Sequence, residues 1–137
     1  MTDNNVFFDT NVLLYLLSEE EGKANIAEAL LAKGGVISVQ VLNEFTSVAF
    51  RKLKMSYSEI GEVLETVRMV CEVKHLTVET HCMALSVAER YRFSFYDALI
   101  LSAAIMADCD VLYSEDMQSG QEINDQMVIN NPFNRND

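Results

Sequence analysis

The sequence contains few of the residues that define several common classes of protein. Its three cysteines, Cys71, Cys82 and Cys109, are odd in number and far apart, which argues against a disulfide framework and against a zinc site with short ligand spacing. We expect all three to be buried, reduced thiols. The only proline is Pro132, and there is no repeat, low-complexity segment or linker, so we expect a single domain over residues 1–137.

Basic residues are also scarce. The sequence has ten lysines and arginines and 21 acidic residues. The resulting net charge of −11 argues against capture of nucleic acid by bulk electrostatics. The basic residues that exist are partly clustered, at 51–54 and 90–92. Two interpretations of these clusters stay open: cations that favour helix ends, or a rim that contacts phosphate groups.

The chain has no long hydrophobic run either. The longest one, 98–107 with Ser102 inside it, is about half the roughly 20 residues that span a bilayer. The first residues lack the basic start of a signal peptide. We therefore expect a soluble, cytoplasmic protein that does not contact a membrane.

Short apolar segments alternate with segments of helical periodicity. Strands are expected at 6–8, 36–39, 73–76, 111–114 and 127–130, and helices at 12–18, 21–33, 40–53, about 56–70, 79–91 and 95–107. Strands separated by helices imply right-handed crossovers and a parallel sheet that is covered on both faces. The sequence thus predicts an α/β fold of three layers (α/β/α) around a central, mostly parallel sheet of 4–5 strands.

Two aspartates lie alone inside long apolar stretches. Asp9 is the only charged residue between Asp3 and Glu19, and Asp97 is the only one between residues 92 and 108. Burying an unpaired carboxylate costs several kcal/mol, so such a residue is usually paired, protonated or bound to a metal ion. No lysine or arginine is near either aspartate in the sequence.

Two further acids are predicted to lie at the same edge of the sheet. Asp9 ends the first expected strand and Asp116 follows the strand at 111–114, where open α/β sheets place their sites. Glu44 lies on or beside the buried stripe of its helix, and Asp97 occupies the first turn of another helix. These four carboxylates can therefore converge.

Each acid also has a purely structural explanation. Asp97 and Ser94 have nearly the spacing of a capping box, and Asp9 would serve as the N-cap of the helix that follows it. Glu44 is an ordinary partly exposed glutamate, and Asp116 lies in an acidic turn. Only the conjunction of all four favours a functional site.

Four carboxylates a few Å apart repel one another unless a divalent cation neutralises them. A ligand set of oxygen atoms alone suits a hard ion, Mg²⁺ or Mn²⁺. His75 and His81 fall outside this set and are expected to be structural. Such metal sites are typical of phosphoryl chemistry, and without a Gly-x-x-x-x-Gly-Lys loop there is no sign of nucleoside triphosphate binding.

Four segments of the chain resemble, in order, the motifs of PIN-domain ribonucleases. They are Phe7–Leu13, Val41–Phe45, Ser94–Ile100 and Leu112–Met117, and the ending at 120–133 is similar to the last strand and tail of the VapC-like toxin branch. Each motif is loose by itself, whereas four in this order are specific. The resemblance covers essentially the whole chain.

The resemblance implies roles for particular residues. Asp9, Glu44 and Asp97 match the invariant acids of the family, Asp116 matches the fourth acid, and Ser114 and Asn11 match supporting residues. Asp9 and Asp97 would bind the metal ion directly, Glu44 would be a ligand or a base acting through water, and Asp116 would support the ion or bind a second one. All four acids are thus candidate catalytic and metal-binding residues.

The resemblance also implies an activity and partners. The family cleaves RNA with Mg²⁺ or Mn²⁺, and its bacterial toxin members are blocked by a cognate antitoxin and commonly form homodimers. Two rival interpretations stay open. A haloacid-dehalogenase-like phosphatase would have a second acid where this chain has Asn11, and a PIN-fold interaction module would lack nuclease activity.

Overall fold

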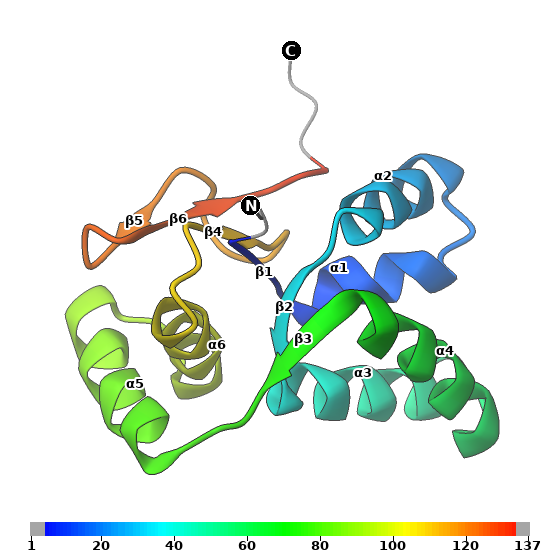
Figure 1. Cartoon of the computed structure of the whole chain (residues 1–137), viewed down its shortest axis with the longest axis horizontal. Helices are drawn as coiled ribbons and strands as arrows, with labels where there is room; N and C mark the ends of the chain where they lie inside the picture. Colours follow the sequence, from blue (N-terminus) through cyan, green and yellow to red (C-terminus); the bar gives the residue numbers. More distant parts are fainter. Residues whose placement is uncertain (1–4, 134–137) are drawn as a thin grey trace.

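Short apolar strands form the middle layer of the molecule, and helices cover both of its faces (Figure 1). The computed structural model describes residues 5–133. Its elements are β1 (Val6–Phe8), α1 (Thr10–Leu14), the 3₁₀ helix η1 (Tyr15–Leu17), α2 (Glu21–Ala32), β2 (Gly35–Ser38), α3 (Val39–Arg51), α4 (Tyr57–Val70), β3 (Cys71–Lys74), α5 (Val78–Tyr91), α6 (Phe95–Met106), β4 (Val111–Tyr113), β5 (Glu122–Ile123) and β6 (Met127–Asn130).

The sheet has the strand order β3-β2-β1-β4-β6-β5. Its first five strands are mutually parallel, and β5 runs antiparallel to β6. Figure 1 shows α5 and α6 together on one side of this sheet and α1 to α4 grouped on the other. The three-layer, mostly parallel α/β fold predicted from the sequence is therefore confirmed.

Apart from one-residue shifts in the bounds of β2 and β4, the sheet differs from the sequence prediction in two details. It has six strands rather than 4–5, because β5 has only two residues and is too short to show an alternating pattern. β3 occupies Cys71–Lys74 rather than 73–76. Cys71 already has extended backbone angles at the end of α4 and lies opposite Gly35 of β2, so helix and strand join without a loop.

The core fills the space between the sheet and the helices on either side. Phe7, Ile37 and Leu112 are fully buried, as expected for parallel strands that are covered on both faces. α6 buries seven of its twelve residues, which explains its nearly continuous apolar sequence. No helix within residues 5–133 is long and apolar enough to cross a membrane.

The cysteines divide into two environments. Cys71 and Cys109 are buried, and burial raises the pKa of their thiols to about 11 and about 12. Cys82 is exposed, so the prediction that all three cysteines are buried was wrong for this one. α5 buries Thr80, Ala84 and Val87, and Cys82 lies between these positions on the outer side of the helix.

Gly35 of β2 packs directly against residues of the neighbouring strand β1. A Cβ atom at this position would lie 2.5 Å from Cε2 of Phe8 and 3.0 Å from the backbone oxygen of Val6. We expect Gly35→Ala to lower the free energy of unfolding by about 1–3 kcal/mol, since the surrounding core is already close-packed.

Urea denaturation of the purified protein measures this effect. Gly61→Ala is the matched control, because a Cβ at Gly61 in α4 meets nothing within 4 Å. That control should gain roughly 0.5–1 kcal/mol from improved helix propensity. Equal stability changes in the two variants would contradict the packing at Gly35.

Candidate active site

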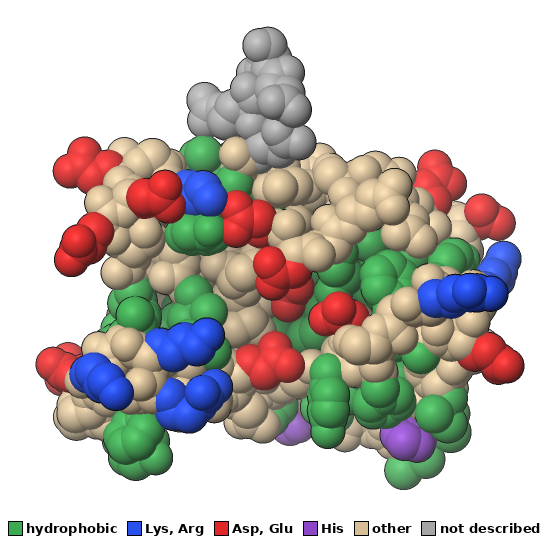
Figure 2. Space-filling view, turned by 180° about the vertical axis from the view of Figure 1, so that it is seen from behind, with side chains coloured by type: hydrophobic (Ala, Val, Ile, Leu, Met, Phe, Trp, Pro, Cys, Tyr) green, Lys and Arg blue, Asp and Glu red, His purple; other side chains and the backbone are tan. Residues whose placement is uncertain are grey.

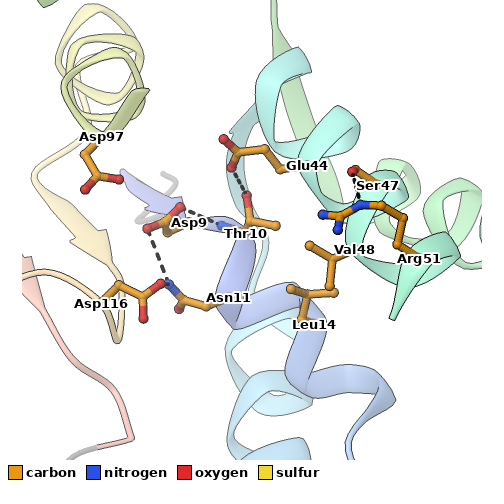
Figure 3. A pocket seen from close by; sticks show the side chains of 10 residues that line it. All are labelled: Asp9, Thr10, Asn11, Leu14, Glu44, Ser47, Val48, Arg51, Asp97 and Asp116. Carbon is orange, nitrogen blue, oxygen red and sulfur yellow. Dashed lines mark hydrogen bonds between the residues drawn. The ribbon is translucent and has the colours of Figure 1, made fainter. Parts of the chain in front are cut away.

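Four acidic side chains line one pocket of about 300 Å³. Asp9 follows β1, Asp116 lies beyond the end of β4, Glu44 is on α3, and Asp97 is in the first turn of α6. Figure 3 shows their carboxylates around the same opening. The structure therefore brings together the four acids that the sequence singled out, whereas their chemical roles stay a prediction.

Asp9 is the most deeply placed of the four acids and is only 6% exposed. It is the N-cap residue of α1: its Oδ1 accepts a hydrogen bond from the backbone N of Thr10 at 2.7 Å. Its Oδ2 accepts one from the Ser114 hydroxyl at 2.9 Å. Burial, together with the charges of Asp97 and Glu44, nevertheless raises the pKa of Asp9 to about 6 against the effect of these hydrogen bonds.

Asn11 connects the first acid to the last. Its amide nitrogen lies 3.1 Å from Oδ2 of Asp116 and 3.4 Å from Oδ2 of Asp9, so its shorter hydrogen bond is to Asp116. Its side-chain oxygen accepts a hydrogen bond from the backbone N of Glu115 at 3.0 Å. The Ser114 hydroxyl also accepts one from the backbone N of Asp116 at 3.2 Å. Asn11 and Ser114 therefore hold the loop after β4 against Asp9.

Glu44 is held by two residues that the sequence did not single out. The Thr10 hydroxyl donates to its Oε1 at 2.7 Å, and the Gln40 amide donates to its Oε2 at 2.9 Å. The same amide lies 3.1 Å from the carbonyl oxygen of Tyr96 at the start of α6. Thr10 and Gln40 are both buried, and only the four-residue spacing of Gln40 and Glu44 on a helix could have indicated one of these contacts.

Asp97 shares its helix end with a capping residue. Ser94 is the N-cap of α6, and its hydroxyl accepts a hydrogen bond from the backbone N of Asp97 at 3.1 Å. The reciprocal bond of a capping box is present at the starts of α4 and α5 and is not found here. Burial raises the pKa of the Asp97 carboxyl group above its usual range, and the charges of Asp116 and Glu44 add to this rise.

No basic side chain within residues 5–133 forms an ion pair with any of these acids. The ion pairs in that range are Lys23–Glu115 and Lys74–Glu72. Nor do three His, Cys, Asp or Glu side chains of the described residues lie close enough to enclose an ion. The buried Asp9, its raised pKa and the purely oxygen donors of the four acids fit a hard divalent cation, which would relieve their repulsion.

Glu115 anchors the loop that carries Asp116. Its carboxylate accepts hydrogen bonds from Lys23 Nζ at 2.8 Å and from the Tyr15 hydroxyl at 2.5 Å. These bonds lower the pKa of Glu115, although burial alone would raise it. Lys23 and Tyr15 belong to α2 and η1, far from Glu115 along the chain, so periodicity could not indicate that these residues meet.

The two basic clusters have different surroundings. Arg51 lines the acidic pocket at the end of α3, which fits the interpretation as a rim. Arg92 is the C-cap of α5 and has left-handed backbone angles, which fits the interpretation as a helix end. His75 and His81 do not line the acidic pocket.

The fold and the pocket together define an α/β protein with an acidic site at the carboxyl ends of its parallel strands. The model of the PIN domain family matches residues 6–119, so the chain belongs to the PIN domain family. Comparison with curated proteins gives no match.

Solved structures extend this similarity over most of the chain. A toxin–antitoxin complex from Klebsiella pneumoniae matches with a TM-score of 0.70 and 19% identity, covering 93% of this chain and 97% of the other. VapC20 of Mycobacterium tuberculosis, a toxin that cleaves the sarcin–ricin loop, matches with a TM-score of 0.65 and 20% identity, covering 81% and 89%. VapBC2 of Rickettsia felis, bound to a promoter DNA fragment, matches with a TM-score of 0.65 and 19% identity, covering 90% and 96%. The chain is therefore a PIN domain with a VapC-like fold.

Proposed function

We propose that this PIN domain is a metal-dependent endoribonuclease and the toxin of a toxin–antitoxin pair, with Mg²⁺ or Mn²⁺ as its cofactor. One observation carries the proposal: four carboxylates from four separate segments line one pocket of a PIN domain. Their repulsion and the burial of Asp9 favour a bound cation. Phosphodiester hydrolysis is the chemistry that such a site supports best.

A bound Mg²⁺ or Mn²⁺ would polarise a phosphate oxygen of RNA and lower the pKa of a water molecule. In this proposal Asp9 and Asp97 would hold the ion directly. Glu44, oriented by Thr10 and Gln40, would be a further ligand or would accept a proton from a water molecule. Asp116, held by Asn11, supports the ion or binds a second one. The expected products carry a 5′-phosphate and a 3′-hydroxyl.

The partners follow from the same proposal. One similar structure is a toxin that cleaves the sarcin–ricin loop, and two others are toxin–antitoxin assemblies. These similarities support an RNA substrate and a cognate antitoxin, and the proposal places the protein in the cytoplasm. The acids of the pocket would attract a basic antitoxin segment, which would block metal binding in the same step.

Cleavage of RNA by the purified protein tests the proposal. We expect a structured RNA to be cut in the presence of Mn²⁺ and to remain intact in EDTA, and the ends of the fragments identify the products. A phosphatase of the haloacid dehalogenase type would instead release phosphate from a small phosphomonoester. This chain lacks the second acid that such a phosphatase needs. Asn11 occupies that position, and its amide donates a hydrogen bond to Asp116. Intact RNA under both conditions would favour the interaction module without nuclease activity.

Association with another chain is a separate expectation. The apolar stripe at 60–70 buries Ile60 and Val67, yet it leaves Met69 80% exposed and Val70 43% exposed at the end of α4. We expect this surface to take part in a homodimer or in antitoxin binding. Light scattering of the wild type and of Met69→Glu measures homodimer formation. A pull-down from the native host detects binding of an antitoxin.

Met69→Glu should weaken the association, because it places a charge in an apolar contact. Leu85→Glu, which alters an exposed apolar residue of α5, is the control. A strictly monomeric wild type with no tight partner in the pull-down would refute this expectation.

A further inference from the structure

A second pocket adjoins the acidic one along α3. We call it the aromatic pocket; it has a volume of about 450 Å³ and is lined by Asn43, Thr46, Ser47, Phe50, Arg51 and Tyr57. Ser47 and Arg51 also line the acidic pocket, so the two pockets are neighbours that share a wall. Nε of Arg51 donates a hydrogen bond to Oγ of Ser47 at 3.2 Å, so the guanidinium group lies at this shared wall. Figure 3 shows it beside the acidic pocket.

Two residues that line the aromatic pocket, Phe50 and Tyr57, have stacked rings. The centroids of Phe50 and Tyr57 are 4.3 Å apart, and their planes differ by only 5°. Both side chains stay open to solvent, with 43% and 65% of their surface exposed. Apolar rings that are parallel and exposed offer a platform on which a further planar group can stack.

Positive charge gathers beside these rings in an otherwise acidic protein. Arg51 ends α3, and Lys52 and Lys54 follow it; all three are exposed. Figure 2 shows acidic side chains near the middle of one face, with lysine and arginine side chains clustered to their lower left, over the region of α3 and α4. A planar group that carries negative charge matches this combination of surfaces.

We propose that the aromatic pocket binds one unpaired nucleotide of the RNA, next to the phosphodiester bond that the acidic pocket would cleave. The base would stack on the Phe50–Tyr57 pair, and the neighbouring phosphate would contact Arg51. This subsite deepens the proposed nuclease function and rests on it. The nucleotide is unpaired because a base within a duplex has no free face to stack on an aromatic side chain.

An RNA nucleotide fits the lining better than a protein partner does. Four of the six lining side chains are polar or charged, which suits contact with the polar edge of a base and with a phosphate group. The buried core of an interface between protein chains is usually more apolar than this lining. The shared wall also lets one RNA strand occupy both pockets without leaving the surface.

Binding of a fluorescent single-stranded oligoadenylate measures the subsite. The protein carries Asp97→Asn so that the RNA stays uncut, and Tyr57→Ala is compared with Tyr57→Phe in this background. Tyr57→Ala should weaken binding by about 5- to 100-fold, the usual range for the loss of one base–aromatic stack, whereas Tyr57→Phe should change it by less than about 2-fold. Leu85→Ala, at an exposed apolar residue of α5, should leave the affinity unchanged.

A set of oligonucleotides with one abasic position each locates the contact. One abasic position should weaken binding to the protein with Tyr57 intact and have no further effect with Tyr57→Ala, because both changes remove the same stack. A plot of log affinity against log salt concentration has a negative slope. Arg51→Gln should make this slope less steep by about 0.7, the value for one phosphate contact on a single strand. Circular dichroism melting confirms that each variant is folded.

The outcomes separate this subsite from the proposed function. Wild-type protein that cleaves RNA, combined with an affinity and KM indifferent to Tyr57→Ala, would overturn the subsite alone. Binding that depends on Tyr57 in a protein that never cleaves RNA would support the subsite and refute the nuclease. Tyr57→Ala could instead retain its RNA affinity while light scattering shows that it no longer forms a dimer. That result would overturn the subsite and assign the two rings to self-association.

Discussion

Asp9→Asn and Asp97→Asn are each expected to lower metal-dependent RNA cleavage by about 100-fold or more. Each substitution removes a negatively charged oxygen from the pocket, and with it both cation binding and the stabilisation of charge in the transition state. The rate of RNA cleavage in Mn²⁺, measured for purified wild-type and variant proteins under single-turnover conditions, tests this expectation.

Asp125→Asn is the matched control. Asp125 is exposed and does not line the acidic pocket, and its positive φ of 56° is one that asparagine also adopts readily. This variant should cleave RNA at the wild-type rate. Retention of more than about a tenth of the wild-type rate by Asp9→Asn or Asp97→Asn would contradict their assignment as metal ligands.

The placement of the four acids could be predicted because it depends on features that a sequence carries locally. Asp9 and Asp116 come directly after short apolar strands, and the carboxyl ends of parallel strands meet at one edge of a sheet. Glu44 and Asp97 lie near the starts of helices that begin at this same edge. Helical and strand periodicity were therefore sufficient to bring these residues to the same end of the fold.

The contacts that hold the acids could not be predicted in this way. Thr10 donates to Glu44 across 34 positions of the chain, and Lys23 reaches Glu115 across 92. Such pairs depend on the rotation of each helix about its axis and on the packing of distant elements, which periodicity does not specify. The exposure of Cys82 was missed for a related reason: a small apolar residue fits either side of an amphipathic helix.

The proposed metal site has a consequence for stability. Without a cation, ionised Asp9 is buried beside other carboxylates, and its pKa is raised from 3.8 to about 6. The folded state therefore holds the proton more tightly than the unfolded state. The stabilisation from protonated Asp9 is complete below a pH of about 4 and is lost as the pH rises through about 6. Two pKa units correspond to roughly 3 kcal/mol.

Metal-free wild-type protein should thus lose stability relative to Asp9→Asn between pH 4 and 6. Comparison with this variant isolates Asp9, because Glu115 has a lowered pKa and changes stability in the opposite direction. Urea denaturation in EDTA across this pH range gives the difference. Saturating Mn²⁺ should abolish most of it above pH 6, since a cation that binds only the folded state replaces the proton.

Asp97→Asn distinguishes a site residue from a capping residue. As a metal ligand, Asp97 is repelled by Asp116 and Glu44 in the empty pocket, so the variant should be at least as stable as the wild type in EDTA at neutral pH. The wild type should melt at a higher temperature with millimolar Mn²⁺, and the variant should gain little. If Asp97 only interacts favourably with the helix dipole, its replacement would instead lower the free energy of unfolding by up to about 1 kcal/mol, with or without metal.

Ser94→Ala is the control for this melting series, because Ser94 is the N-cap of α6 and its hydroxyl accepts the hydrogen bond from the backbone of Asp97. It should lower stability by about 1 kcal/mol and keep the full response to Mn²⁺. If Asp97→Asn behaves like Ser94→Ala, destabilised with a wild-type metal response, then Asp97 serves the helix alone. The acidic pocket would then lose one of the two ligands on which the nuclease proposal depends.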